Sequence, residues 1–198
     1  YLPTAVEGAN WIIRDSETPL YPYLTFVRFI EGDTTVSERT YKKLYERTID
    51  YLDTPGGPQL APPYTVLPDR RLIALLRDET TQRRVYGMVS NSNVNGGQFY
   101  IDTLLHDYSL EVGDTLLGRN FDSGQGALVI TTTGTVDRFG GERRFQAATD
   151  LKFYEGVGSM EFGPVSGGSD FRTGCCIFLL HDYCVGDFSD CGLVLSPT

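Results

Sequence analysis

The two histidines are the residues of this chain with the widest chemical use. His106 and His181 are the only histidines among 198 residues, and each directly precedes an aspartate. A histidine oriented by a carboxylate can activate a serine, and geometry rather than chain order defines such a triad. However, the chain has no Gly-x-Ser-x-Gly segment to expose a nucleophile. We therefore expect strand-borne histidines half in the core, and no catalysis.

The four cysteines offer a second kind of chemistry. They lie close together near the C-terminus, at Cys175, Cys176, Cys184 and Cys191. Neighbours on a strand point to opposite faces, so one of the adjacent pair would face the core while the other could reach either of the later cysteines. Zinc held by these residues with His181 is the alternative, but no Cys-x2-Cys spacing is present. We expect one disulfide, no metal and no cofactor.

A Gly-Asp-Thr segment occurs twice, at residues 32–34 and 113–115. Glycine adopts a positive φ, aspartate accepts a nearby backbone N–H and threonine starts a strand, so both copies predict turns. Paired Asp33 and Asp114 as calcium ligands would need more oxygen donors than the surrounding sequence offers. The glycines of residues 155–159 lack the combination of a preceding hydrophobic strand with a following helix, which disfavours a dinucleotide site.

The overall charge excludes some partners. The net charge is -9 and the sequence pI about 4.7, so the chain would repel a phosphate backbone and we expect no nucleic acid. No apolar run approaches ~20 residues, so we expect no transmembrane helix. The sequence starts at Tyr1 without an initiator methionine, and we expect a processed product whose export signal was removed.

Short aromatic and β-branched runs alternate with Gly, Pro and Asn clusters along the whole chain, a rhythm typical of antiparallel all-β proteins. We expect one β-domain over residues 1–198, with an extended segment at 1–9. It would be an antiparallel β-barrel or β-sandwich, a meander of about ten strands with at most one short helix. The expected strands cover residues 10–15, 23–31, 39–46, 71–77, 83–89, 98–105, 127–136, 143–154, 175–182 and 192–195.

Two segments leave alternatives open. In residues 37–52 the apolar side chains recur at helical spacing, and Thr35 with Glu38 resembles a capping box. We expect a strand over the first half, with a helical turn after Arg47 possible. In residues 20–29 both faces of the expected strand are largely apolar, so either the strand is covered on both sides or one face docks a partner.

Several segments together resemble a secreted domain of Bacteroidetes proteins, which often carry a C-terminal sorting domain for type IX secretion. The matching segments are Val6-Glu7-Gly8 with Trp11, Gly32-Asp33-Thr34 with Tyr41 to Tyr45, Leu75 to Glu79 with Arg84 to Tyr86, Leu105 to Thr115, and Glu155 to Ser159. His106 departs from the family pattern, which has an aromatic residue there. The resemblance implies a secreted β-rich fold without assigned catalysis. The sorting domain itself is not in this sequence.

The function that we expect is structural. The chain would be a non-catalytic subunit that associates with itself into an extracellular or cell-surface filament or sheath, because strand edges and an extended segment can pair with a neighbour. The alternative is an extracellular module that binds a glycan or another ligand. The residues expected at assembly contacts are Tyr1, Leu2, Pro3, Val6, Tyr21, Tyr23, Phe26 and Phe29.

Overall fold

The structure is a computed structural model of the whole chain. It describes residues 1–15, 25–50, 62–90, 101–116, 127–148, 151–160, 163–165 and 178–196. Every structural statement below concerns these residues.

The described chain is all-β. No helix occurs in these ranges, and hence none with the length and apolarity needed to cross a membrane. The strands are β1 (Ala9–Asp15), β2 (Thr25–Val36), β3 (Arg39–Thr48), β4 (Tyr64–Val66), β5 (Arg71–Glu79), β6 (Arg84–Val89), β7 (Thr103–Asp107), β8 (Thr115–Leu116), β9 (Leu128–Val129), β10 (Thr132–Asp137), β11 (Glu142–Ala148), β12 (Leu151–Tyr154), β13 (Gly158–Ser159), β14 (Phe178–Val185) and β15 (Leu193–Leu195).

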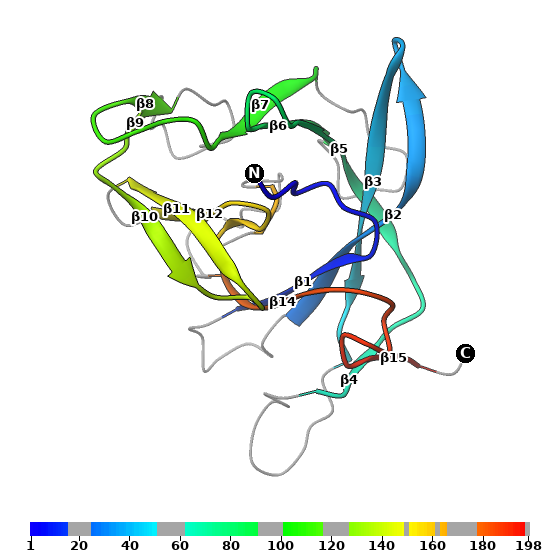
Figure 1. Ribbon diagram of the computed structural model, residues 1–198. Coiled ribbons are helices and arrows are strands. Elements are labelled where there is room, and N and C mark those ends of the chain that lie inside the picture. The colour runs from blue at the N-terminus through cyan, green and yellow to red at the C-terminus, as the bar shows by residue number, and fades with distance from the viewer. Residues whose placement is uncertain are drawn as a thin grey trace.

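Most of these strands form two antiparallel sheets that curve around a common interior (Figure 1). The larger sheet has seven strands in the order β14-β1-β2-β3-β5-β6-β7, and the smaller has four in the order β10-β11-β12-β13. The backbone N–H of Leu180 on β14 donates to the carbonyl of Met160, just after β13 (2.6 Å), so the sheets meet at this edge. The prediction of an antiparallel all-β fold is confirmed.

Two short pairs complete the fold. β8 pairs with β9 in antiparallel fashion, whereas β15 pairs with β4 in parallel. The parallel pair lies outside the larger sheet and holds the C-terminal part of the chain against it (Figure 1). Three strands fall where none was expected, because β4, β8 and β13 are only two or three residues long. Such short pieces carry no readable alternation.

The larger sheet is covered on both faces. Its inner face contributes to an inner core, made of Ala9, Trp11, Ile13, Ile30, Leu44, Ile73, Ala74, Leu76, Val89, Leu105, Tyr154, Val157, Val165, Leu180 and Tyr183. On the other face lies an outer core, made of Ile12, Val27, Phe29, Ile49, Tyr64, Val66, Cys191 and Leu193. A third cluster, beside β8 and β9, contains Val85, Tyr108, Leu116, Leu128, Ile130, Ala148 and Phe153.

These cores settle the two open segments. Residues 39–48 form β3, so the strand is confirmed there, and no helical turn follows Arg47 up to Asp50. On β2, Ile30 belongs to the inner core while Val27 and Phe29 belong to the outer core. The described part of the 20–29 segment is therefore covered on both sides. Residues 20–24 lie outside the described residues.

Candidate functional site

Of the two histidines, His106 is a buried residue that packs in the protein interior. His106 on β7 is buried, its Nε2 donates to the Pro164 carbonyl (3.0 Å), and its ring stacks on Tyr108. Burial lowers the pKa of His106 to about 4, so the ring is neutral at neutral pH. The Asp107 carboxylate accepts from Arg84 and from Ser109 instead. His106 and Asp107 are therefore not arranged as a catalytic couple, while His181 is exposed on β14.

The two Gly-Asp-Thr segments adopt different backbone structures. Gly113 has φ 96°, Asp114 accepts the Glu111 backbone N–H (2.8 Å) and Thr115 opens β8, which confirms that copy as a turn. The other copy was wrongly predicted as a turn. Gly32 lies inside β2 at a bulge, where the pairing with β3 skips from Ile30 to Asp33. The apolar residues of the facing strand β3 recur at helical spacing, so the sequence of β3 did not indicate a bulge in β2. No group of three or more metal-ligating side chains occurs in the described residues.

The bulge matters because it faces the N-terminal segment, by which we mean residues 1–8. The Gly32 backbone N–H, released from the ladder by the bulge, donates to Glu7 Oε1 (2.9 Å). Glu7 also pairs with Lys42 (3.0 Å), which in turn pairs with Asp33 (2.6 Å). These ion pairs are substantially exposed, so they stabilise the segment only weakly.

A stronger attachment lies at the other end of the segment. Asp78, near the end of β5, accepts three hydrogen bonds: from the Tyr1 hydroxyl (2.5 Å), the Thr4 N–H (3.0 Å) and the Ala5 N–H (2.6 Å). Two successive backbone N–H groups form a concave anion-binding surface, which suits a carboxylate. Hydrogen bonds to a charged acceptor are about twice as strong as neutral ones.

The side chain of Tyr1 is buried in this attachment. It is only 7% exposed, although the residue as a whole is 37% exposed, so the exposure lies in the backbone. The ring packs against Tyr108 (6.3 Å between centroids). Burial raises the pKa of the Tyr1 hydroxyl well above its usual range, and the bond to Asp78 acts in the same direction. The hydroxyl therefore stays protonated and donates.

Glu155 supplies a second buried carboxylate. It follows β12 directly, and its side chain is 6% exposed. Arg83 binds its Oε1 through two nitrogens (3.0 and 3.3 Å), and the amino group of Tyr1 lies 4.0 Å from the same atom. Arg83 is placed by the β5–β6 turn, where it has φ 58°. Two cationic groups thus converge on one buried carboxylate, as a buried charge requires.

Gly156 leaves room for the segment. It has φ 77°, and a Cβ there would lie 2.9 Å from Leu2 Cβ and 2.8 Å from Arg143 Nη1. A larger residue would push against the docked chain. We call Asp78, Arg83, Tyr108, Glu155 and Gly156 the acceptor site. It brings together segments of β5, the β5–β6 turn, the end of β7 and the turn after β12, and Figure 1 shows the N-terminal segment lying between the two larger sheets.

The expected assembly residues are placed unequally. Leu2 and Pro3 are exposed, Thr4 between them and the sheet is fully buried, and Val6 is half-buried against the inner core. Phe26 also packs against the inner core, whereas Phe29 is 4% exposed and unavailable to a partner while this packing lasts. Tyr21 and Tyr23 lie outside the described residues.

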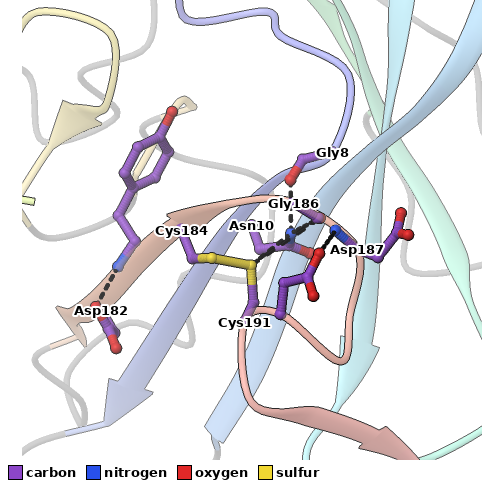
Figure 2. Close-up of a disulfide and its surroundings, with 9 residues drawn as sticks. Gly8, Asn10, Asp182, Cys184, Gly186, Asp187 and Cys191 are labelled. Atoms are coloured by element: carbon purple, nitrogen blue, oxygen red, sulfur yellow. Dashed lines mark hydrogen bonds between the residues drawn. A yellow bond between two sulfur atoms is a disulfide. The ribbon is translucent and has the colours of Figure 1, made fainter. Parts of the chain in front are cut away.

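The disulfide lies beside the start of β1, where Asn10 pairs with Cys184 on β14. Cys184 on β14 bonds to Cys191, seven residues later (Figure 2). The expected presence of a disulfide is confirmed, and the pairing that the sequence left open follows from a tight turn over Asp187 to Asp190, which returns the chain. Asn10 Nδ2 donates to the carbonyls of Gly8 (2.7 Å) and Gly186 (3.1 Å) beside it. Cys175 and Cys176 lie outside the described residues.

Sequence reasoning missed Asp78 and Glu155 as binding residues. Both lie in segments that carried the family resemblance, as do Glu7 and Lys42, but none of these segments showed a chemistry when read singly. The signal that could have indicated a shared site was the number of these segments. Residues from four of them contact the N-terminal segment in the structure. Only the pairing of distant strands brings them together.

Comparison with known proteins adds no assignment. No protein-family model, curated protein or solved structure matches the chain. The resemblance to the secreted Bacteroidetes domain therefore stays a prediction, and the function rests on the molecule's own geometry.

Proposed function

We propose that the chain is a secreted, non-catalytic structural subunit, and that its copies associate by exchanging their N-terminal segments. The observation that carries this proposal is the docking of residues 1–5 on the acceptor site through three hydrogen bonds to Asp78 and one buried tyrosine. The segment is not a strand, and β1 begins only at Ala9. It can therefore leave without opening the larger sheet.

Exchange conserves the contacts that it breaks. A segment that leaves its own acceptor site and enters a neighbour's forms the same bonds again, so the net free energy is set mainly by the hinge and by protein concentration. The hinge would be residues 6 and 7, because Gly8 is held by backbone hydrogen bonds to Ile30 (3.3 Å) and Gly186 (3.0 Å) at the start of β1. The Glu7 ion pairs are exposed, so they oppose this movement only weakly.

The disulfide supports the extracellular part of the proposal. Disulfides persist in oxidising compartments and are rare in the reducing cytosol. The Cys184–Cys191 bond is internal to one chain, so it does not itself link copies.

Cross-linking between two single variants tests the exchange. A Leu2→Cys protein is mixed with a Gly156→Cys protein at high concentration, mildly oxidised, and digested for peptide mass spectrometry, which separates new links from those of the four native cysteines. If copies exchange, a disulfide forms between the two introduced cysteines on different chains. The two positions are neighbours, because a Cβ at Gly156 would lie 2.9 Å from Leu2 Cβ, and an outward shift of about 1 Å by the docked segment brings this distance to the ~3.8 Å that a disulfide needs.

The matched control replaces Gly156→Cys by Gly140→Cys. Gly140 has a similar φ of 80° but nothing within 4 Å, so it shares the backbone strain and lacks the contact. Links that form equally with both glycine positions, or that form only inside a chain carrying both changes, would rule out exchange.

A further inference from the structure

The smaller sheet ends in an exposed strand edge. β10 pairs with β11 on one side and with no other described strand, and Figure 1 shows it as the outer strand of this sheet. At the sheet's other end, the residue after β13, Met160, bonds to Leu180 on β14, and the edge strand β7 of the larger sheet is largely buried. β10, in contrast, is half-buried to exposed along its whole length. Its outer side is therefore available to a further strand.

That outer side presents the backbone groups of alternate residues. Arg144, which lies opposite Thr135, gives its carbonyl to the Glu155 N–H on the β12 side (2.9 Å). The backbone groups of Thr135 therefore point away from β11, and by the alternation of an antiparallel ladder so do those of Thr133 and Asp137. No described residue outside β11 forms a backbone hydrogen bond with β10.

This edge lacks the features that keep strand edges apart in other proteins, which are lysines, prolines, bulges and inward-pointing charges. β10 pairs with β11 in unbroken register and contains neither lysine nor proline. Threonine and valine, which favour extended backbone, make up most of the strand. No charged residue occurs from Leu128 to Val136, although the whole chain has a net charge of -9. The strand thus has the composition of a segment that pairs readily with another strand.

We infer that β10 is an assembly edge, which pairs in antiparallel fashion with β10 of a second copy and joins two smaller sheets into one. Charge favours a second copy at this edge. Two chains with a net charge of -9 repel each other, and an uncharged edge is where their backbones can approach. With a twofold axis near Gly134, Thr133 faces Thr135 of the partner subunit, a favourable cross-strand pair. The two Asp137 carboxylates then lie at opposite ends of the paired strands.

The contact goes beyond the proposed exchange and does not require it. A reciprocal exchange of N-terminal segments closes a pair of copies, because both segments and both acceptor sites are then occupied. A separate twofold contact through β10 can link such pairs into a longer assembly. β10 has only six residues, so we expect this contact to be weak by itself and to form at high protein concentration.

Amide hydrogen exchange, followed by NMR on the full-length chain over a range of concentrations, tests the pairing directly. The N–H groups of Thr133 and Thr135 should become protected as the concentration rises. Thr135→Pro removes an outward N–H and no bond to β11, whereas Thr135→Ala removes the same side chain and keeps the N–H. In sedimentation velocity, the proline variant should weaken the β10 contact roughly tenfold, and the alanine variant should stay within about twofold.

Charge variants test whether the partner is a second copy. A protein with Thr133→Lys and Thr135→Lys places like charges opposite each other across the axis, and so does one with glutamate at both positions, so each alone should lose association. Mixing the two proteins should restore it. The control, Thr35→Lys with Thr40→Lys, makes the same charge change on the exposed β2–β3 hairpin and should associate as the wild type does.

The outcomes separate this contact from the exchange. Unchanged protection of Thr133 and Thr135 up to the solubility limit overturns the inference, even if the Leu2→Cys and Gly156→Cys proteins cross-link. Equal association of the folded proline and alanine variants also overturns it. If the proline variant does not fold, failure of the mixed charge variants to associate decides against the inference. Concentration-dependent protection without cross-links keeps the β10 contact and contradicts the exchange.

Discussion

At the scale of single residues, the unusual positions of this protein are buried polar groups and strained turns. His106 is the clearest case, because its Nδ1 is buried without a hydrogen-bond partner in the described structure while Nε2 donates to Pro164. A neutral ring that carries its proton on Nε2 has no N–H at Nδ1. A protonated ring would bury an Nδ1–H donor without an acceptor, which costs free energy. The same residue that looked reactive in the sequence is thus a packing element with a dependence on pH.

We predict that His106 makes stability fall in acid. Its pKa is lowered by burial from 6.5 to about 4, so the unfolded state binds the proton first as pH drops. The stabilisation is complete above pH 6.5 and is lost as pH falls from 6.5 toward 4, by roughly 3 kcal/mol. Urea unfolding of the wild type and of His106→Gln across this range measures the difference. His181→Gln is the exposed control, and equal slopes for all three proteins would contradict the prediction.

A second residue-scale prediction concerns the β2–β3 turn, which projects from the body (Figure 1). Ser37 and Glu38 have φ 47° and 67°, the conformation in which Asn-Gly is preferred. The double change Ser37→Asn with Glu38→Gly should relieve strain and raise the free energy of unfolding by about 1 kcal/mol. Chemical denaturation measures this value. A lowered midpoint would show that the native side chains hold the turn in some other way.

At the scale of elements, the larger sheet explains why one strand resembled a helix. Leu44 of β3 packs in the inner core and Tyr45 against the outer core, so apolar residues occupy both faces. A strand covered on two sides loses the simple alternation of buried and exposed positions, and its apolar residues can fall at intervals of three and four. Strands with one buried and one half-buried face, such as β6, kept their alternation and were predicted well.

The disulfide is the element that fastens the outer core. Cys184 and Cys191 link β14 to the turn before β15, and Cys191 itself packs in the outer core. Replacing both by serine should lower the free energy of unfolding by about 2 kcal/mol, as expected for a short closed loop. Denaturation with and without reductant measures the loss. If reductant destabilises the serine variant as much as the wild type, another cysteine pair is responsible.

At the scale of the whole molecule, Trp11 on β1 connects the larger sheet to the smaller one within the inner core. Trp11 is fully buried, and its Nε1 donates to the Val157 carbonyl (2.7 Å) in the turn after β12. It is also the only tryptophan of the chain. Its fluorescence therefore reports directly on whether the sheets separate.

We predict one cooperative unfolding transition, which also tests the expectation of a single domain. Trp11 fluorescence and the β signal in circular dichroism should give coincident curves in urea, because the inner core contains residues from Ala9 to Tyr183. Trp11→Phe should lower stability by about 1–3 kcal/mol through the unpaired Val157 carbonyl and lost packing. Two separated transitions would show that the sheets unfold independently.

The sequence by itself was enough for the all-β class, most strand positions and the presence of a disulfide. Those features depend on the local alternation of apolar and polar residues, on turn residues and on cysteine content, all of which can be read from short segments of the sequence. The bulge at Gly32, the Cys184–Cys191 pairing and the union of Asp78, Glu155 and Tyr1 were decided only by the tertiary structure. They depend on register between strands far apart in sequence, and register follows from how whole faces pack rather than from any one segment.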